Sequence, residues 1–148
     1  MSDSPDVQVR VAIYREFVRT SRAPSAARLA EIMDTPLPEI REALERLAAG
    51  KAIFLQPESR EILLAAPLCT VPTPFLVRTA EQSFFGTCIW DALGILAMLH
   101  QDGTVETSCG CCGEALSLEI RGGSVSGSPS IVHFALPAKQ WWADIVFT

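Results

Sequence analysis

Three prolines near the middle of the chain, Pro67, Pro72 and Pro74, divide this sequence into two parts. Proline fixes φ and lacks a backbone N–H, so such a segment favours a stiff, extended connector over a helix or a central strand. The whole chain has 148 residues, so each part is small for an independent domain. The sequence predicts a module at residues 1–66, a connector at 67–74 and a second module at 75–148.

The first part carries the pattern of three helices followed by a hairpin. Its apolar residues recur at helical spacing. Ser25 is placed to cap the second helix, and Gly50 is placed to end the third. The pattern predicts helices over residues 7–20, from 25 to 33 and from a turn at 34–36 to 49, then short strands at 53–55 and 62–64. This order of elements predicts a winged-helix-like module.

The charge balance bears on the partners of such a module. Winged helices often bind DNA through the third helix, but here that helix has more acidic than basic residues: Glu39, Glu42 and Glu45 against Arg41 and Arg46. The chain has 12 Lys and Arg against 17 Asp and Glu, a net charge of -5. A protein that binds a polyanion needs a positive surface. The sequence therefore argues against nucleic acid and anionic membrane as partners.

The chain shows no export signal, and its cysteines fit a reducing compartment. Residues 1–6 are polar and acidic, unlike a signal peptide. The longest apolar stretch, at 89–99, is interrupted by Asp91 and is shorter than the roughly 20 residues that cross a bilayer. We therefore expect a cytoplasmic protein without a membrane span. Its 5 cysteines are an odd number, which indicates reduced thiols: Cys69, Cys88, Cys109, Cys111 and Cys112.

The second part combines strands with one strongly apolar helix. Thr87 is an N-cap candidate for a helix over residues 88–99, which is apolar on nearly every face and is expected to be buried. Pro137 predicts the start of a last helix, over 138–147. Strands are predicted at 75–79, 104–108, 116–120 and 131–136, with a loop at 122–129. The sequence thus predicts an α+β fold, in which a winged-helix-like three-helix module precedes a small mixed α/β core.

Cys88 and Asp91 form the sharpest local motif. In a helix that begins at Cys88, a residue three positions later lies on the same face, so the thiol and the carboxylate are expected to be neighbours. The positive end of the helix dipole is expected to lower the pKa of the thiol, which favours a nucleophile or a soft-metal ligand. On spacing alone a purely structural interpretation is stronger, because free cysteines are often buried and an Asp often stabilises a first turn.

Cys109, Cys111 and Cys112 gather at the tip of the predicted hairpin. The spacing of Cys109 and Cys112 is that of a zinc or redox pair. A structural zinc site needs four ligands, and the candidates to complete it are Cys69, Cys88 and His133. A very soft ion needs only two thiolates, so the tip suits such an ion better. His133 itself lies between apolar residues, where a hydrogen-bonded core role is more common than a catalytic one.

Taken in order along the chain, these residues resemble the alkylmercury lyases, enzymes that split carbon–mercury bonds. The likeness covers roughly residues 84–142. It rests on aromatic residues shortly before the Cys-x-x-Asp motif of an apolar helix, on the Cys109 segment with its following Gly and alternating strand, and on a strand with His133 and Phe134. The resemblance implies a winged-helix-like domain before a catalytic core, Cys88 and Asp91 as catalytic residues, and structural roles for Cys109 and His133.

The chain departs from the family pattern at the second catalytic cysteine. The family places that cysteine just before the strand of His133, where this chain has Pro129 and Ser130. Cys111 or Cys112 can replace it only if the hairpin tip folds over Cys88. The identity of the second thiol therefore stays open at the level of the sequence.

The end of the chain is a second departure. Relatives continue past the segment at residues 144–148, so we expect a truncated chain. One hypothesis is that the residue after Thr148 is encoded as selenocysteine, with its UGA codon read as a stop. The nucleotides downstream of the gene test this, because the hypothesis requires a UGA and a matching reading frame.

The resemblance implies protonolysis of an organomercurial: Cys88 binds mercury, a second thiol adds electron density, and Asp91 relays a proton to carbon. The expected partner is a small organometallic substrate or a soft metal ion, with no organic cofactor, mercury(II) as bound substrate or product, and zinc or another thiophilic ion as the alternative. The mercury ligands are expected among Cys88, Cys109, Cys111 and Cys112. The competing hypothesis is a non-catalytic, soft-metal-binding or metal-sensing winged-helix protein. A homodimer is left open.

Overall fold

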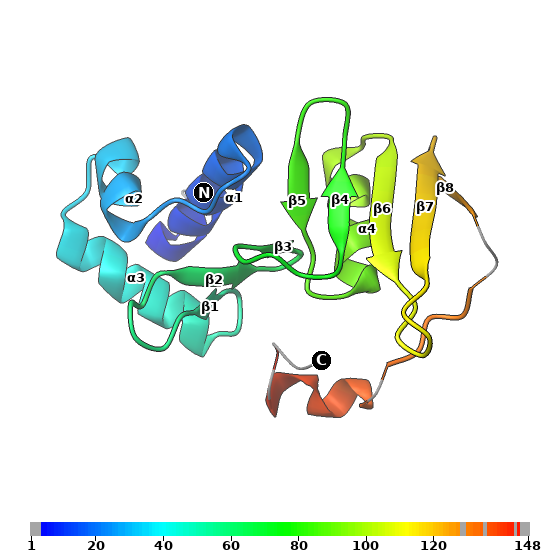
Figure 1. The fold of residues 1–148 in the computed structure, drawn as a ribbon. Coiled ribbons are helices and arrows are strands. Elements are labelled where there is room, and N and C mark those ends of the chain that lie inside the picture. Colours follow the sequence, from blue (N-terminus) through cyan, green and yellow to red (C-terminus); the bar gives the residue numbers. More distant parts are fainter. Residues whose placement is uncertain (1–3, 128–129, 135, 144, 146–148) are drawn as a thin grey trace. The chain divides into compact units, whose positions relative to one another are not determined.

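The computed structural model describes residues 4–127, 130–134, 136–143 and 145 (Figure 1). The chain divides into two compact units, Met1–Val71 and Pro72–Thr148. Each unit combines helix with antiparallel strands, which confirms the predicted α+β class. In the described part of the chain, no helix has the length and apolar character that crossing a membrane requires.

The helices of the first unit follow the predicted capping signals. They are α1 (Pro5–Thr20), α2 (Ala26–Met33) and α3 (Leu37–Ala49). Ser25 caps α2, because its hydroxyl accepts a hydrogen bond from the N–H of Arg28 at 3.1 Å. Gly50 follows the last residue of α3, as the sequence predicts. The three helices are therefore confirmed with nearly the predicted bounds.

A small antiparallel sheet completes this unit. It consists of β1 (Phe54–Leu55), β2 (Ile62–Ala65) and β3 (Leu68–Cys69), with β2 paired to both neighbours. The strand β3 lies inside the predicted connector at 67–74. The residues between β3 and β4 form no strand. Apolar side chains of the helices and of β2 form the core of this unit: Val9, Ile13, Leu29, Ile40, Leu44 and Ile62.

The second unit is built on an antiparallel sheet in the order β5-β4-β6-β7-β8. Its strands are β4 (Leu76–Arg78), β5 (Ser83–Phe85), β6 (Gly103–Ser108), β7 (Ala115–Arg121) and β8 (Ser124–Gly127). The predicted strands at 75–79, 104–108 and 116–120 are confirmed as β4, β6 and β7. The strand β5 was not predicted from the sequence.

The predicted loop at 122–129 is wrong for residues 124–127, which form β8, and residues 128–129 lie outside the described residues. Gly122 and Gly123 form a tight turn with φ values of 54° and 76°, a conformation that glycine adopts without strain. The chain therefore folds straight back, and β8 pairs with β7. A glycine pair was interpreted as a loop signal, although it is also the signal of a two-residue hairpin turn.

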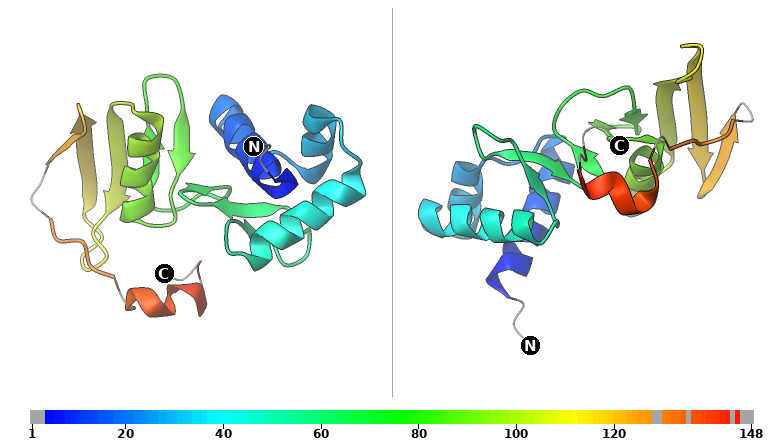
Figure 2. Two further views of the ribbon diagram at one scale, coloured as in Figure 1. Left: turned by 180° about the vertical axis from the view of Figure 1, so that it is seen from behind. Right: turned by 90° about the horizontal axis from the view of Figure 1, so that it is seen from below.

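The helix α4 (Ile89–Leu99) covers one face of this sheet and contacts β4 and β6 (Figure 2). Its Ala92, Ile95 and Leu96 are buried, whereas the side chain of Trp90 is 69% exposed. The prediction that α4 is buried on nearly every face is therefore wrong. A helix that packs on a single sheet buries one stripe only, whatever the composition of its other faces.

The described residues after β8 contain no strand. The strand predicted at 131–136 is wrong for residues 131–134, and Ile131 is 95% exposed. The edge of β7 is already paired with β8, so this segment finds no free backbone groups there. A 3₁₀ helix at Ala138–Ala143 replaces the start of the predicted α-helix at 138–147, whose end falls partly outside the described residues.

Candidate thiol and carboxylate site

The antiparallel sheet places two chemically relevant segments at one end of the second unit. β5 and β6 both run antiparallel to β4, so both strands terminate at the same end of the sheet. The helix α4 begins directly after β5, and the β6–β7 hairpin turns directly after β6 (Figure 1). The start of α4, with Cys88 and Asp91, and the cysteines of the hairpin tip therefore lie at the same end.

Gly86 permits the close approach of this connection to α4. A Cβ atom at this position would lie 2.7 Å from the backbone nitrogen of Ala92 and 3.1 Å from the carbonyl carbon of Asp91. The N–H of Gly86 donates to the carbonyl of Phe75 at 3.1 Å and extends the pairing of β4 with β5. The first turn of α4 is therefore held against the end of β5.

Thr73 fixes the same connection from the other side. Its hydroxyl donates to the carbonyl oxygen of Gly86 at 2.5 Å and accepts from the N–H of Phe75 at 3.2 Å. The sequence analysis did not single out Thr73 or Gly86. Gly86 stands between aromatic residues and the start of a predicted helix, and this position indicates a close approach of the backbone. The role of Thr73 depends on the pairing of β4 with β5, which the sequence does not display.

Cys88 is the N-cap residue of α4, with an extended backbone (φ -146°, ψ 177°). The prediction that Thr87 caps this helix is wrong, because the helix starts one residue later. The Thr87 hydroxyl instead donates a hydrogen bond to the carboxylate of Asp91, and the Thr87 N–H donates to the same oxygen at 3.4 Å. Thr87 is thus a double hydrogen-bond donor to the carboxylate of Asp91, which lies in the first turn of α4.

Burial raises the pKa of the Asp91 carboxyl, although the two hydrogen bonds from Thr87 act in the opposite direction. Burial also raises the pKa of the Cys88 thiol. The backbone N–H groups of Asp91 and Trp90 oppose that rise, while the charge of Asp91 adds to it. The predicted lowering of the Cys88 pKa by the helix N-terminus is therefore wrong in its net direction, because desolvation outweighs the dipole. Burial thus disfavours the charged form of each group.

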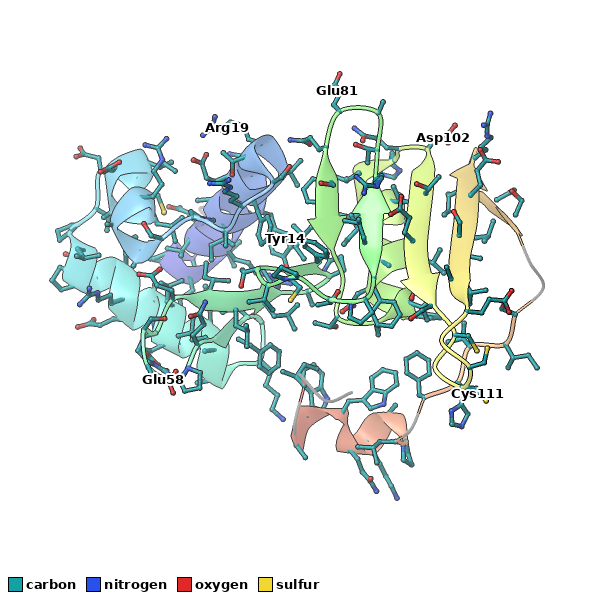
Figure 3. The ribbon with its side chains drawn as sticks, viewed as in Figure 1. Tyr14, Arg19, Glu58, Glu81, Asp102 and Cys111 are labelled. Atoms are coloured by element: carbon teal, nitrogen blue, oxygen red, sulfur yellow. The ribbon has the colours of Figure 1, made fainter. Side chains whose placement is uncertain are left out.

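The hairpin tip holds the other three cysteines of this unit (Figure 3). Cys109 is half-buried, whereas Cys111 and Cys112 are exposed. The turn is closed by two backbone hydrogen bonds, from the N–H of Cys109 to the carbonyl of Glu114 at 2.8 Å and from the N–H of Gly113 to the carbonyl of Cys109 at 2.9 Å. The N–H groups of Cys112 and Cys111, with the Cys112 thiol, lower the pKa of Cys109.

The described residues do not converge on one multidentate metal site. Among them, no group of three or more His, Cys, Asp or Glu side chains is placed to hold a metal ion. Cys69 is buried in β3 of the first unit, and His133 is exposed in the segment without a strand. The expected burial of His133 is therefore not found, because its segment does not join the sheet. Ser130 is exposed, and Pro129 lies outside the described residues.

Thr107 is a further polar residue that the sequence analysis missed. It lies two residues after the buried Val105 on β6, so both side chains point to the face that α4 covers. Its hydroxyl oxygen is buried and has no hydrogen-bond partner among the described residues. The alternation of side chains along β6 indicates that Thr107 and Val105 lie on the same face. The sequence does not show which face of the strand the helix covers.

A comparison with protein-family models identifies one matching family, described as alkylmercury lyase, over residues 68–148. This match covers more than half of the chain and includes the start of α4 and the hairpin tip. The chain belongs to the alkylmercury lyase family. The resemblance noted from Cys88, Asp91 and Cys109 is thereby confirmed at the level of the family.

A solved structure supports the same fold for this alkylmercury lyase family member. The mercury-bound form of MerB2 superimposes with a TM-score of 0.68 at 18% sequence identity, over 84% of this chain and 59% of that one. At this identity the likeness shows the fold, and the chain spans about three-fifths of the length of that relative. A comparison with curated proteins finds no match.

Proposed function

We propose that the protein is an organomercurial lyase, which cleaves carbon–mercury bonds by protonolysis. The observation that carries this proposal is the placement of Asp91 in the first turn of the helix that Cys88 caps, within a family of alkylmercury lyases. A soft thiol is a good ligand for mercury, and a carboxyl beside it can hold and deliver a proton. A simple metal trap has no use for that carboxyl.

The proposed reaction moves one proton and changes no oxidation state. The Cys88 sulfur forms a bond to the mercury of an organomercury cation, and the thiol proton passes to Asp91. Asp91 then gives this proton to the carbon, which keeps the electron pair of the broken carbon–mercury bond. The products are a hydrocarbon and a mercuric ion bound to Cys88. The raised pKa of Asp91 suits this role, because it makes the carboxylate a better acceptor of the thiol proton than an exposed Asp.

A second thiol is proposed to share the mercury with Cys88 during cleavage. Additional thiolate bonds push electron density toward the carbon and stabilise the mercuric product. The candidates are the tip cysteines, and the support for them is that the β6–β7 hairpin turns at the same end of the sheet at which α4 begins. Movement of the tip toward Cys88 upon mercury binding is part of this proposal.

The first unit is proposed to be a winged-helix-like module with a supporting role. Three helices followed by antiparallel strands support this assignment. Three arginines of its helices pair with acidic residues: Arg19 and Arg28 with Glu16, and Arg46 with Asp6. These pairs reduce the positive surface available to nucleic acid. The free thiols support a cytoplasmic location.

The direct test is to incubate the reduced protein with a phenylmercury salt and to quantify benzene. The proposal expects benzene from the wild-type protein and background levels from Cys88→Ser and Asp91→Ala. Circular dichroism of both variants checks that they fold. Tight mercury binding without benzene would overturn the lyase and favour a soft-metal-binding protein.

A further inference from the structure

The hairpin tip between β6 and β7 carries more thiols than the proposed reaction requires. Within four residues it offers Cys109, Cys111 and Cys112, whereas the proposed reaction at Cys88 uses one additional thiol. All three are free, and two are exposed. Exposed free thiols in a reducing environment are costly to retain without a use, because they oxidise and bind metals readily.

The geometry of the turn selects two of these thiols as a pair. The bonds that close the turn join the backbone of Cys109 to the backbones of Glu114 and Gly113, which brings the two ends of the segment together. The Cys112 thiol lies within hydrogen-bonding reach of the Cys109 sulfur. Cys111 contributes only its backbone N–H to that sulfur. The side-chain pair is therefore Cys109 with Cys112, which also have the Cys-x-x-Cys spacing of a metal-binding or redox pair.

The surroundings of Cys109 stabilise the negative charge of its thiolate. The sulfur of Cys109 faces the backbone N–H groups of Cys112 and Cys111, which stabilise a negative charge and lower the pKa of this thiol. Burial and the charge of the Glu114 carboxylate oppose this shift, and they are its two smallest causes. The pKa of the Cys88 thiol shifts in the opposite direction, because its burial raises it.

We propose that Cys109 and Cys112 form a dithiol site that binds a two-coordinate soft cation, with mercuric ion as its type ligand, independently of Cys88. On binding, two S–H bonds lose their protons to solvent and two sulfur–mercury bonds form, without oxidation or reduction. The linear geometry of such an ion needs no third ligand. The described residues place no third His, Cys, Asp or Glu at this pair, so a four-coordinate zinc ion is not matched.

The two thiols on one turn act as a chelate. Once one sulfur holds the cation, the second is present at a high effective concentration, typically in the millimolar range or above. A single thiol lacks this advantage and exchanges its mercury with free monothiols. Mercury bound by a pair of thiols is therefore expected to stay on the protein in the presence of a free monothiol, whereas mercury bound by a lone cysteine is not.

The experiment uses the full-length, reduced protein in a Cys88→Ser background, which removes the proposed lyase thiol. One equivalent of mercuric chloride is added, followed by excess glutathione, and retained mercury is measured after desalting, together with the ultraviolet absorption of sulfur–mercury bonds. Cys88→Ser and Cys88→Ser with Cys111→Ser are expected to retain one mercury per chain. The double variant with Cys88→Ser and Cys112→Ser is expected to retain mercury about 100-fold more weakly.

Cys111→Ser and Cys112→Ser are matched, because both replace an exposed thiol of the same turn. Equal retention by the two variants, or loss of mercury from the Cys88→Ser protein itself, would overturn the proposal. The outcome is separate from that of the lyase assay, because every protein in this experiment lacks Cys88. A lyase without a tip site, and a tip site without a lyase, therefore give different results.

Discussion

At the scale of single residues, burial rather than the helix dipole sets the chemistry of the candidate site. Both Cys88 and Asp91 lie half-buried at the start of α4, and desolvation is the largest influence on the pKa of each. Spacing in the sequence predicts that the two residues are neighbours. It does not predict the sign of the pKa shift of Cys88, because burial depends on strands that are distant in sequence.

The raised pKa of Cys88 predicts slow alkylation at neutral pH. The thiolate is the reactive form, so the rate with iodoacetamide is expected to keep rising as the pH passes the ordinary thiol value of 9.0. Because the charge of Asp91 contributes to the rise, Asp91→Asn is expected to lower the Cys88 pKa and to speed labelling at pH 7. Peptide mass spectrometry measures both rates. Exposed Glu81→Gln is the control, and slower labelling of Asp91→Asn would contradict the account.

Thr87 is predicted to position Asp91 through its hydroxyl. Hydrogen bonds to a carboxylate stabilise its charged form, so Thr87→Val is expected to raise the Asp91 pKa further, while Thr87→Ser keeps the wild-type value. Carboxyl carbon NMR over a pH titration measures the shift. Valine has nearly the same shape as threonine, so packing is maintained. An Asp91 titration that is identical in the valine and serine variants would remove Thr87 from the site.

At the scale of elements, local signals predict the helices and fail for the sheet. Ser25 and Gly50 mark the ends of helices through contacts within one turn, which the sequence displays directly. The strand β8 and the missing strand at 131–134 depend on which segment reaches the edge of β7 first. The two-residue turn at Gly122 and Gly123 pairs β8 with β7, and the pattern of hydrophobic residues does not predict this pairing.

The contact of β5 with α4 predicts a specific effect of Gly86→Ala. The added Cβ meets the backbone of Ala92 at 2.7 Å, and neither backbone segment can give way cheaply. We expect a loss of about 1–3 kcal/mol in the free energy of unfolding and a larger exposure of Cys88.

Urea unfolding measures the stability, and thiol titration of the folded protein measures the exposure. Gly110→Ala is the matched control, because a Cβ at that position meets nothing within 4 Å. Equal stability of the two variants would show that the first turn of α4 is not held against β5.

At the scale of the whole molecule, the sequence identifies the family but not the complete reaction centre. The order of Cys88, Asp91 and Cys109 along the chain predicts an alkylmercury lyase family member, and the family match over residues 68–148 confirms it. Neither the order nor the spacing predicts how far the tip thiols lie from Cys88. That distance depends on the hairpin turn and on its motion, which is why the second thiol remains a proposal.

The overall charge and the pairing of the basic residues give a second expectation at this scale. The net charge is -5, and arginines of the first unit are neutralised by nearby carboxylates, as in the pair of Arg60 with Glu45. We therefore expect a small uncharged or weakly charged organomercurial, rather than a polyanion, as the partner of the molecule.

The central claim is that Asp91 delivers a solvent-exchangeable proton to the carbon of a substrate held by Cys88. The measurement is a single turnover of phenylmercury by the reduced protein in D₂O, with benzene analysed by mass spectrometry. The account predicts benzene with one deuterium per molecule from the wild-type protein and about 100-fold slower formation by Asp91→Asn. Benzene without deuterium, or undiminished benzene from Asp91→Asn or Cys88→Ser, would contradict it.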